Sequence, residues 1–143
     1  MSQQSLIDAG KAPVLAYGEK NWNEVRASVA PGVLYDEIAT HRKTHGVDQL
    51  LTAWQGWAAA FPDSKATFQN AFVSGNTVVL EVTWRGTHKG PLQTPGGRFA
   101  ATGKTIEVPA CLITEIGDGK AKSMRHYFDM ATLMQQLGVE KAA

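Results

Sequence analysis

Apolar residues recur with two different periods along this chain, and the change of period separates a helical first part from a strand-rich second part. From 77 to 88 apolar and polar residues alternate, with Glu81 on one face of a predicted strand and Trp84 on the other. From 47 to 61 the spacing is instead helical and gives one broad apolar face, made by Leu50, Leu51, Trp54, Trp57, Ala58 and Phe61.

Two further helices are predicted before residue 47. The first runs from Ser5 to about Lys20, with Ser5 and Asp8 resembling a capping box. Pro13 fits poorly in the middle of a helix, so this helix is expected to restart there. Asn21 is the predicted cap of a second, short helix, which is expected to end at Pro31-Gly32.

Strands are predicted at 33–40, 66–73, 77–88, 105–116 and 121–128, and polar or Gly/Pro-rich loops at 41–46 and 90–97. Gly117-Asp118-Gly119 suits a tight hairpin turn. Asp129 is the predicted cap of a last helix, 130–137, which Gly138 ends. Helices followed by an antiparallel run indicate an α+β fold.

Length and composition fit one globular domain over residues 1–143, with 43% hydrophobic and 19% charged residues. The net charge of +1 is spread without a basic block, so neither nucleic acid nor an anionic membrane is an expected partner. The single cysteine, Cys111, excludes an intrachain disulfide and suits a reducing, cytoplasmic location. We expect no signal peptide and no membrane span.

Several short motifs occur together in one order and span most of the chain. They are Trp57, Ala60-Phe61-Pro62-Asp63, Gly86-Thr87-His88-Lys89-Gly90, Asp118-Gly119-Lys120, Tyr127-Phe128-Asp129 and Gln136-Leu137-Gly138. In this the chain resembles the SnoaL-like polyketide cyclases, or ester cyclases, of the nuclear-transport-factor-2-like superfamily. The resemblance implies a cone: three N-terminal helices on a curved, mostly antiparallel sheet, with a short C-terminal helix and one open, ligand-sized end. It also implies a homodimer, with the outer sheet face carrying Val79, Glu81, Thr83 and Arg85 as the interface.

His126 is the first candidate for catalysis. The resemblance implies an acid/base aspartate on the last strand, three residues before Asp129, and His126 stands there in this chain. The family's supporting histidine, fourteen residues earlier, is replaced by Leu112. Met124, His126 and Phe128 share one face of their predicted strand, and the apolar neighbours indicate that this face is inward. Histidine can move a proton near neutral pH. The alternative is a buried histidine that is hydrogen-bonded to backbone or to a carboxylate.

Glu37 is the second candidate, because Val33, Tyr35 and Glu37 share one face of their predicted strand. If that face is inward, Glu37 could pair with His126; Asp36 and Ile38 are the alternative inward set. Asp129 is interpreted first as a helix cap and only second as a catalytic group. His88 and Arg98 are placed at a loop that could border the mouth of the cone.

A hydrophobic cavity is expected between the helix 47–61 and the concave sheet face. We expect it to be lined by Tyr17, Tyr35, Trp54, Trp57, Phe68, Trp84, His88 and Leu112. No metal or cofactor motif is evident: His41 and His45 fall in a predicted loop.

These features predict an enzyme without cofactor that acts on a small hydrophobic carbonyl compound by cyclisation, isomerisation or dehydration. His126, tuned by Glu37, would remove a proton next to the carbonyl, and Tyr35 or Tyr17 would donate a hydrogen bond to the enolate oxygen. At least one ring nitrogen of His126 is expected to be free for ligand or water, and activity is expected to rise through a pKa near neutrality. The alternative is a binding protein without catalysis.

Overall fold

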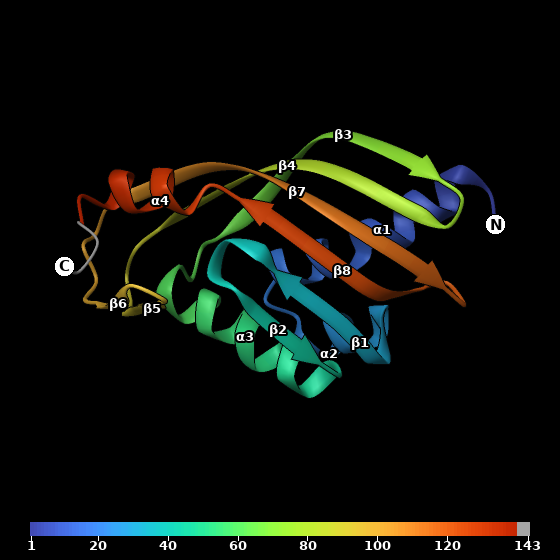
Figure 1. Cartoon of the computed structure of the whole chain (residues 1–143), viewed down its shortest axis with the longest axis horizontal. Helices are drawn as coiled ribbons and strands as arrows, with labels where there is room; N and C mark the ends of the chain where they lie inside the picture. The colour runs from blue at the N-terminus through green and yellow to red at the C-terminus, as the bar shows by residue number, and fades with distance from the viewer. Residues whose placement is uncertain (140–143) are drawn as a thin grey trace.

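A six-stranded curved sheet is the frame of the molecule (Figure 1). The computed structural model describes residues 1–139. The strand order is β2-β1-β8-β7-β4-β3, in which β1 and β8 are parallel and all other neighbours antiparallel. The bounds are β1 Val29–Glu37, β2 Arg42–His45, β3 Lys65–Ser74, β4 Thr77–Thr87, β7 Thr105–Gly117 and β8 Lys120–Phe128. The predicted α+β class and mostly antiparallel sheet are confirmed.

Four α-helices accompany this sheet in the described residues: α1 Gln3–Gly18, α2 Trp22–Ser28, α3 Val47–Ala60 and α4 Met130–Leu137. Helix α1 begins earlier than predicted, because Ser2 rather than Ser5 is its cap and accepts a hydrogen bond from the Ser5 amide. The expected restart at Pro13 is wrong, since α1 continues through that residue. The predicted Asn21 cap of α2 is confirmed by its hydrogen bond from the Glu24 amide.

Three predicted boundaries around β1 and β2 differ from the structure. Pro31-Gly32 lies inside β1, not at a helix end, at a point where the β1–β8 ladder is irregular and the missing proline N–H costs no ladder bond. The predicted loop 41–46 contains β2, an edge strand whose exposed positions are polar. The predicted strand 33–40 ends at Glu37, and a 3-10 turn, η1 Ile38–Thr40, follows.

The predicted loop 90–97 folds into a small hairpin of β5 Leu92–Thr94 and β6 Gly97–Phe99. Leu92 is buried and packs with Phe61, Ile106 and Leu133 in a second, smaller hydrophobic cluster. In Figure 1 this hairpin lies at the same end of the molecule as α4. The buried side chain of Leu92 therefore attaches a Gly/Pro-rich segment to this second cluster.

The C-terminal hairpin and helix have the predicted form. Asp118 and Gly119 have positive φ values of 52° and 74°, as a tight hairpin turn requires. The Asp129 side chain accepts from the Thr132 amide at the start of α4, and Gly138 caps its end. A capping role for Asp129 is therefore what the structure describes.

The concave face of the sheet carries the main core, and α1 and α3 pack against it. Val78, Leu80, Leu112 and Met124 are at most 1% exposed on this face. On β8 the inward set includes Met124 and His126, whereas Tyr127 points outward and is 41% exposed. The predicted inward phases of β4 and β8 are confirmed, and they bring His126 to the helix-covered side.

Candidate functional site

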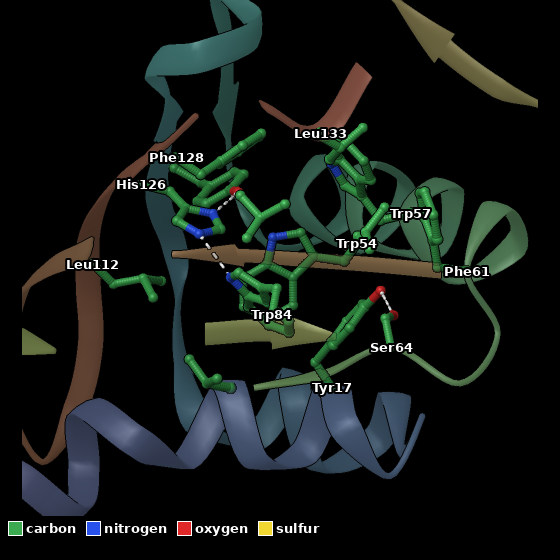
Figure 2. A pocket seen from close by; sticks show the side chains of 14 residues that line it. Tyr17, Trp54, Trp57, Phe61, Ser64, Trp84, Leu112, His126, Phe128 and Leu133 are labelled. Carbon is green, nitrogen blue, oxygen red and sulfur yellow. Dashed lines mark hydrogen bonds between the residues drawn. The ribbon is translucent and has the colours of Figure 1, made fainter. Parts of the chain in front are cut away.

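An aromatic cavity lies between the concave face, α1 and α3 (Figure 2). Its volume is about 70 Å³, far less than the roughly 300–1,000 Å³ of typical small-molecule pockets. Seven residues predicted for the site line it: Tyr17, Tyr35, Trp54, Trp57, Trp84, Leu112 and His126. A drug-sized ligand would therefore need some of the aromatic side chains to move.

His126 is buried in the wall of this cavity and both of its ring nitrogens are hydrogen-bonded to side chains. Its Nδ1 lies 2.9 Å from the Tyr35 hydroxyl, and its Nε2 accepts from Trp84 Nε1 at 3.1 Å (Figure 2). The expectation of a free ring nitrogen is therefore wrong. Neither partner is a backbone group, and both partners line the cavity.

Glu37 lies behind Tyr35 and is completely buried. Four donors converge on its carboxylate. Oε2 accepts from the Tyr35 hydroxyl at 2.7 Å and from Trp57 Nε1 at 3.0 Å. Oε1 accepts from Thr40 at 2.6 Å and from Arg42 at 3.0 Å. Four donors match the acceptor capacity of an ionised carboxylate, and the Arg42 guanidinium balances its charge.

These contacts fix the direction of every hydrogen bond in the chain from Glu37 to Trp84. The Tyr35 hydroxyl has one hydrogen, which it donates to Glu37, so it must accept from His126 Nδ1–H. The Trp84 indole can only donate, so Nε2 must be the unprotonated nitrogen. His126 is thus held as the neutral Nδ1–H tautomer, with the lone pair of Nε2 covered by Trp84.

Burial lowers the pKa of His126 to about 4, against an opposing attraction from the Glu37 charge. Burial also raises the pKa of Tyr35 well above its usual value, and the neighbouring Glu37 charge acts in the same direction. Both groups are therefore neutral at pH 7. Glu37 and His126 are neighbours across β1 and β8, but their hydrogen bonds connect them through Tyr35 rather than directly.

A second polar pair, Tyr17 and Ser64, lines the cavity away from His126. The Tyr17 hydroxyl lies 2.6 Å from Ser64 Oγ, and both residues are at most 6% exposed. Figure 2 shows the Trp84 indole between this pair and His126. Burial raises the pKa of Tyr17 to about 12, so this hydroxyl keeps its proton at neutral pH.

The family model for SnoaL-like polyketide cyclases matches residues 12–137 of the chain. This chain belongs to the SnoaL-like polyketide cyclase family. A search of curated proteins found no match.

Solved structures similar to this SnoaL-like chain share its fold. TsrD from Streptomyces laurentii has a TM-score of 0.83 at 22% identity, over 98% of this chain and 99% of TsrD. IdmH from Streptomyces antibioticus has a TM-score of 0.80 at 24% identity, over 96% and 100%. An LEH-like epoxide hydrolase of M. tuberculosis has a TM-score of 0.72 at 16% identity, over 94% and 90%.

Two predicted ligand-binding residues of this SnoaL-like protein do not line the cavity. Phe68 packs against the main core, with the Lys11 ammonium 5.0 Å from its ring centre. His88 is not at an exposed loop but is fully buried, stacked on Phe61 and hydrogen-bonded through Nδ1 to Thr102. Glu37 also lies outside the lining, in contact with it through Tyr35 and Trp57.

Sequence reasoning missed Ser64, the second polar group of the cavity wall, together with several apolar wall residues. Ser64 lies in the turn after α3, where no hydrophobic period marks an inward position. The missed apolar residues are Val14, Phe61, Ile106, Val108, Phe128 and Leu133. Phe128 shares the predicted inward face of His126 but was not named as a lining residue. The alternation of β7 would have shown Ile106 and Val108 to be inward, in phase with Leu112.

Neither metal-binding side chains nor a membrane-spanning helix is found in the part of the chain that the structure describes. No three His, Cys, Asp or Glu side chains among residues 1–139 come close enough to hold a metal ion. No helix in this range is long and apolar enough to cross a bilayer.

Proposed function

We propose that this SnoaL-like protein binds a small hydrophobic carbonyl compound and catalyses a cofactor-free acid/base reaction on it, with His126 as the proton-accepting group. Nε2 of His126 takes a proton from a carbon that the carbonyl activates. The electron pair of the broken C–H bond becomes an enolate, and the proton returns to carbon or oxygen as the product forms. Cyclisation, double-bond isomerisation and dehydration all share this first step.

The observation that carries the proposal is the fixed tautomer of His126. A general base needs an unprotonated nitrogen directed at the substrate and a second group that holds its ring. Tyr35 holds Nδ1–H, and the buried Glu37 holds Tyr35. The remaining nitrogen, Nε2, belongs to a residue that lines the cavity. Glu37 and Tyr35 are therefore positioning residues in this proposal, and His126 is the residue that reacts.

Trp84 must leave Nε2 before the reaction can begin. Its indole N–H occupies the lone pair that would receive the substrate proton. The small cavity volume supports the same movement, because typical small-molecule ligands need more room than about 70 Å³. We therefore propose that the substrate displaces the Trp84 indole and occupies part of its space.

Exchange of carbon-bound hydrogen tests the proposal without knowledge of the natural substrate. The protein is incubated in D₂O with 2-tetralone, a fused-ring ketone, and deuterium uptake is followed by mass spectrometry. Wild type should accelerate uptake over buffer, and His126→Ala should lose at least about a hundredfold of that acceleration. His45→Ala, at an exposed histidine, is the matched control and should exchange like wild type. Equal rates in His126→Ala and wild type would refute catalysis by His126.

A binding protein without catalysis is the second candidate. The two hydrogen bonds of His126, one at each ring nitrogen, support it. Both ring nitrogens are satisfied within the protein, as in a histidine that stabilises a cavity wall. This candidate predicts that 2-tetralone quenches tryptophan fluorescence, since three of the lining residues are tryptophans, while wild type gives no exchange above buffer. Binding that survives His126→Ala would favour it further.

We also propose that the protein acts as a cytoplasmic homodimer that pairs through the outer sheet face. Phe72, Val79 and Ile113 follow one another across β3, β4 and β7 on this face, and Phe72 is 55% exposed. Val79 and Ile113 are partly buried, so the row is apolar and partly exposed, which is compatible with an interface. Sedimentation should give a dimer at micromolar concentration and a monomer for Ile113→Glu; a monomeric wild type would contradict the proposal.

A further inference from the structure

We propose that the Tyr17–Ser64 hydroxyl pair is an oxygen-binding subsite, which receives a carbonyl or phenolic oxygen of the ligand at the end of the cavity opposite His126. This inference rests on the proposed function and adds a second polar contact to the same cavity. It starts from the composition of the cavity wall. Apart from His126 with its partners Tyr35 and Trp84, the wall offers polar side-chain atoms at Tyr17, Ser64, Trp54 and Trp57. The Trp57 N–H is bonded to Glu37, and the Trp54 N–H interacts with the Tyr35 hydroxyl.

The hydroxyl pair is able to donate to a ligand. Tyr17 and Ser64 each carry one hydroxyl hydrogen, and their mutual contact of 2.6 Å uses only one of the two. The other hydrogen has no partner among the hydrogen bonds of the described residues. A ligand oxygen placed against the pair would therefore receive a hydrogen bond that the protein does not otherwise use.

Lys20 adds a positive charge beside this pair. Its ammonium lies 4.3 Å from the centre of the Tyr17 ring and donates to the Ser64 carbonyl oxygen. Burial lowers the pKa of Lys20, an effect that the charge of Asp63 opposes. A nearby ammonium favours an oxygen that gains negative charge, as the oxygen of an enolate or phenolate does.

The turn that carries Ser64 is held in place from two sides. Asp63 accepts from the Thr87 amide at 2.7 Å and from the Thr87 hydroxyl at 2.8 Å. Gly86 lies directly under the turn, where a Cβ would come within 3.2 Å of the Ser64 Cα. A side chain at position 86 would push the turn away by a few tenths of an ångström, so glycine favours this close approach. These contacts hold Ser64 against β4.

The ring geometry sets the length of the ligand. Trp84 contacts both ends: its ring centre lies 5.5 Å from that of Tyr17 and 5.9 Å from that of His126. A ligand that reaches both polar ends after displacing Trp84 must therefore be about as long as the indole.

Matched probes with and without the oxygen test this subsite apart from catalysis. Isothermal titration compares 2-naphthol with naphthalene. Wild type should bind 2-naphthol more tightly by about tenfold, which corresponds to one hydrogen bond in a buried site. Tyr17→Phe and Ser64→Ala should each reduce this preference severalfold. Tyr127→Phe, the same change at an exposed tyrosine, should keep it.

The outcomes separate this inference from the proposed function. His126→Ala should retain the preference for 2-naphthol even when hydrogen exchange into 2-tetralone is lost. A wild type without hydrogen exchange that still prefers 2-naphthol would refute the catalytic proposal and keep the subsite. Equal binding of the two probes, binding of neither, or an unchanged preference in both Tyr17→Phe and Ser64→Ala would overturn the subsite. Thermal unfolding by circular dichroism checks that each variant is folded.

Discussion

His126 and His88 are two buried histidines on inward-facing positions, yet their surroundings differ in the property that matters for chemistry. Burial lowers the pKa of both rings. His88 stacks on Phe61 and accepts from the Thr102 amide and hydroxyl, all within the packing between β4 and the segment after β6. His126 is held by Tyr35 and Trp84, which line the cavity. Burial alone therefore does not mark a candidate base; contact with a cavity does.

The hydrogen-bond chain behind each ring sharpens the contrast. Behind His126 stand Tyr35 and then a fully buried carboxylate with four donors. His88 is hydrogen-bonded through Nδ1 to one threonine, Thr102, and the Nε2 of His88 has no partner among the described residues. A charged group that is connected through two hydrogen bonds can stabilise an imidazolium that forms during a reaction. Glu37 can do this for His126, whereas the neutral Thr102 cannot do it for His88.

The largest expected effect is on catalysis, where substitution of His126 should abolish the exchange reaction and substitution of His88 should not. His126→Ala should remove at least about a hundredfold of the 2-tetralone exchange rate, because the proton acceptor is gone. His88→Ala should keep the rate within about twofold, although loss of its stacking and hydrogen bonds should destabilise the fold by about 2 kcal/mol. Exchange rates and urea unfolding measure the two effects. A similar loss of rate in both variants would abolish the distinction.

Removal of the carboxylate behind His126 should give the next largest effect. Glu37→Ala should lower the free energy of unfolding by about 3 kcal/mol, because Tyr35 and Trp57 would be left buried without their acceptor. Asp36→Ala, at the neighbouring outward position of β1, is the matched control and should change stability by less than about 0.5 kcal/mol. Urea unfolding that shows equal losses for the two variants would contradict the buried network.

The lowered pKa of His126 should make stability depend on acid. The unfolded ring has a pKa near 6.5 and the folded ring one of about 4, so the unfolded state binds more protons between these values. Stability is therefore complete above about pH 6.5 and falls as pH drops toward 4. Over this window wild type should lose about 3 kcal/mol more than His126→Gln, in which His88 and the carboxylates still titrate. Denaturant unfolding from pH 7 to pH 4 measures the free energy of unfolding of both proteins. If this free energy changed with pH equally in the two proteins, the buried neutral ring would be refuted.

The same pKa revises the expected activity profile. The sequence predicted activity that rises through a pKa near neutrality. Because burial lowers the pKa of His126 to about 4, the ring is already unprotonated throughout pH 5 to 8. We therefore expect exchange to be flat over that range and to fall only near pH 4.

The smallest expected effect concerns the hydrogen bond that Trp84 donates to Nε2 of His126. Trp84→Phe removes a donor that stabilises the neutral ring, so the pKa of His126 should rise by less than about one unit. The pKa of His88, whose ring has no hydrogen bond to Trp84, should not change. Titration of the ring signals by NMR measures both values. A fall in the His126 pKa would show that Trp84 does not donate to Nε2.

Sequence patterns predicted the parts of the site that lie on regular elements. The alternation of Met124, His126 and Phe128 placed His126 inward, and the shared face of Tyr35 and Glu37 anticipated their common network. Both inferences work because side chains of a strand alternate strictly between faces. A one-residue error in the register of either strand would have placed all of these side chains on the outer face of the sheet.

The parts that were missed depend on turns and on contacts distant in sequence. Thr40 ends the predicted strand 33–40 and Arg42 lies in the predicted loop 41–46, and their role follows only from the buried Glu37 beside them. Ser64 reaches the cavity because Asp63 and Gly86 fix its turn against β4. The bonding of both His126 nitrogens depends on Trp84 and Tyr35, which no local pattern brings together.

The tautomer of His126 tests the central claim most directly. Long-range ¹H–¹⁵N correlation spectra of the imidazole rings, assigned with His126→Gln, distinguish a protonated from an unprotonated ring nitrogen. At pH 6 to 7 the account predicts a neutral His126 with the proton on Nδ1 and none on Nε2, as Glu37 and Tyr35 require. A proton on Nε2, alone or as part of an imidazolium, would contradict it.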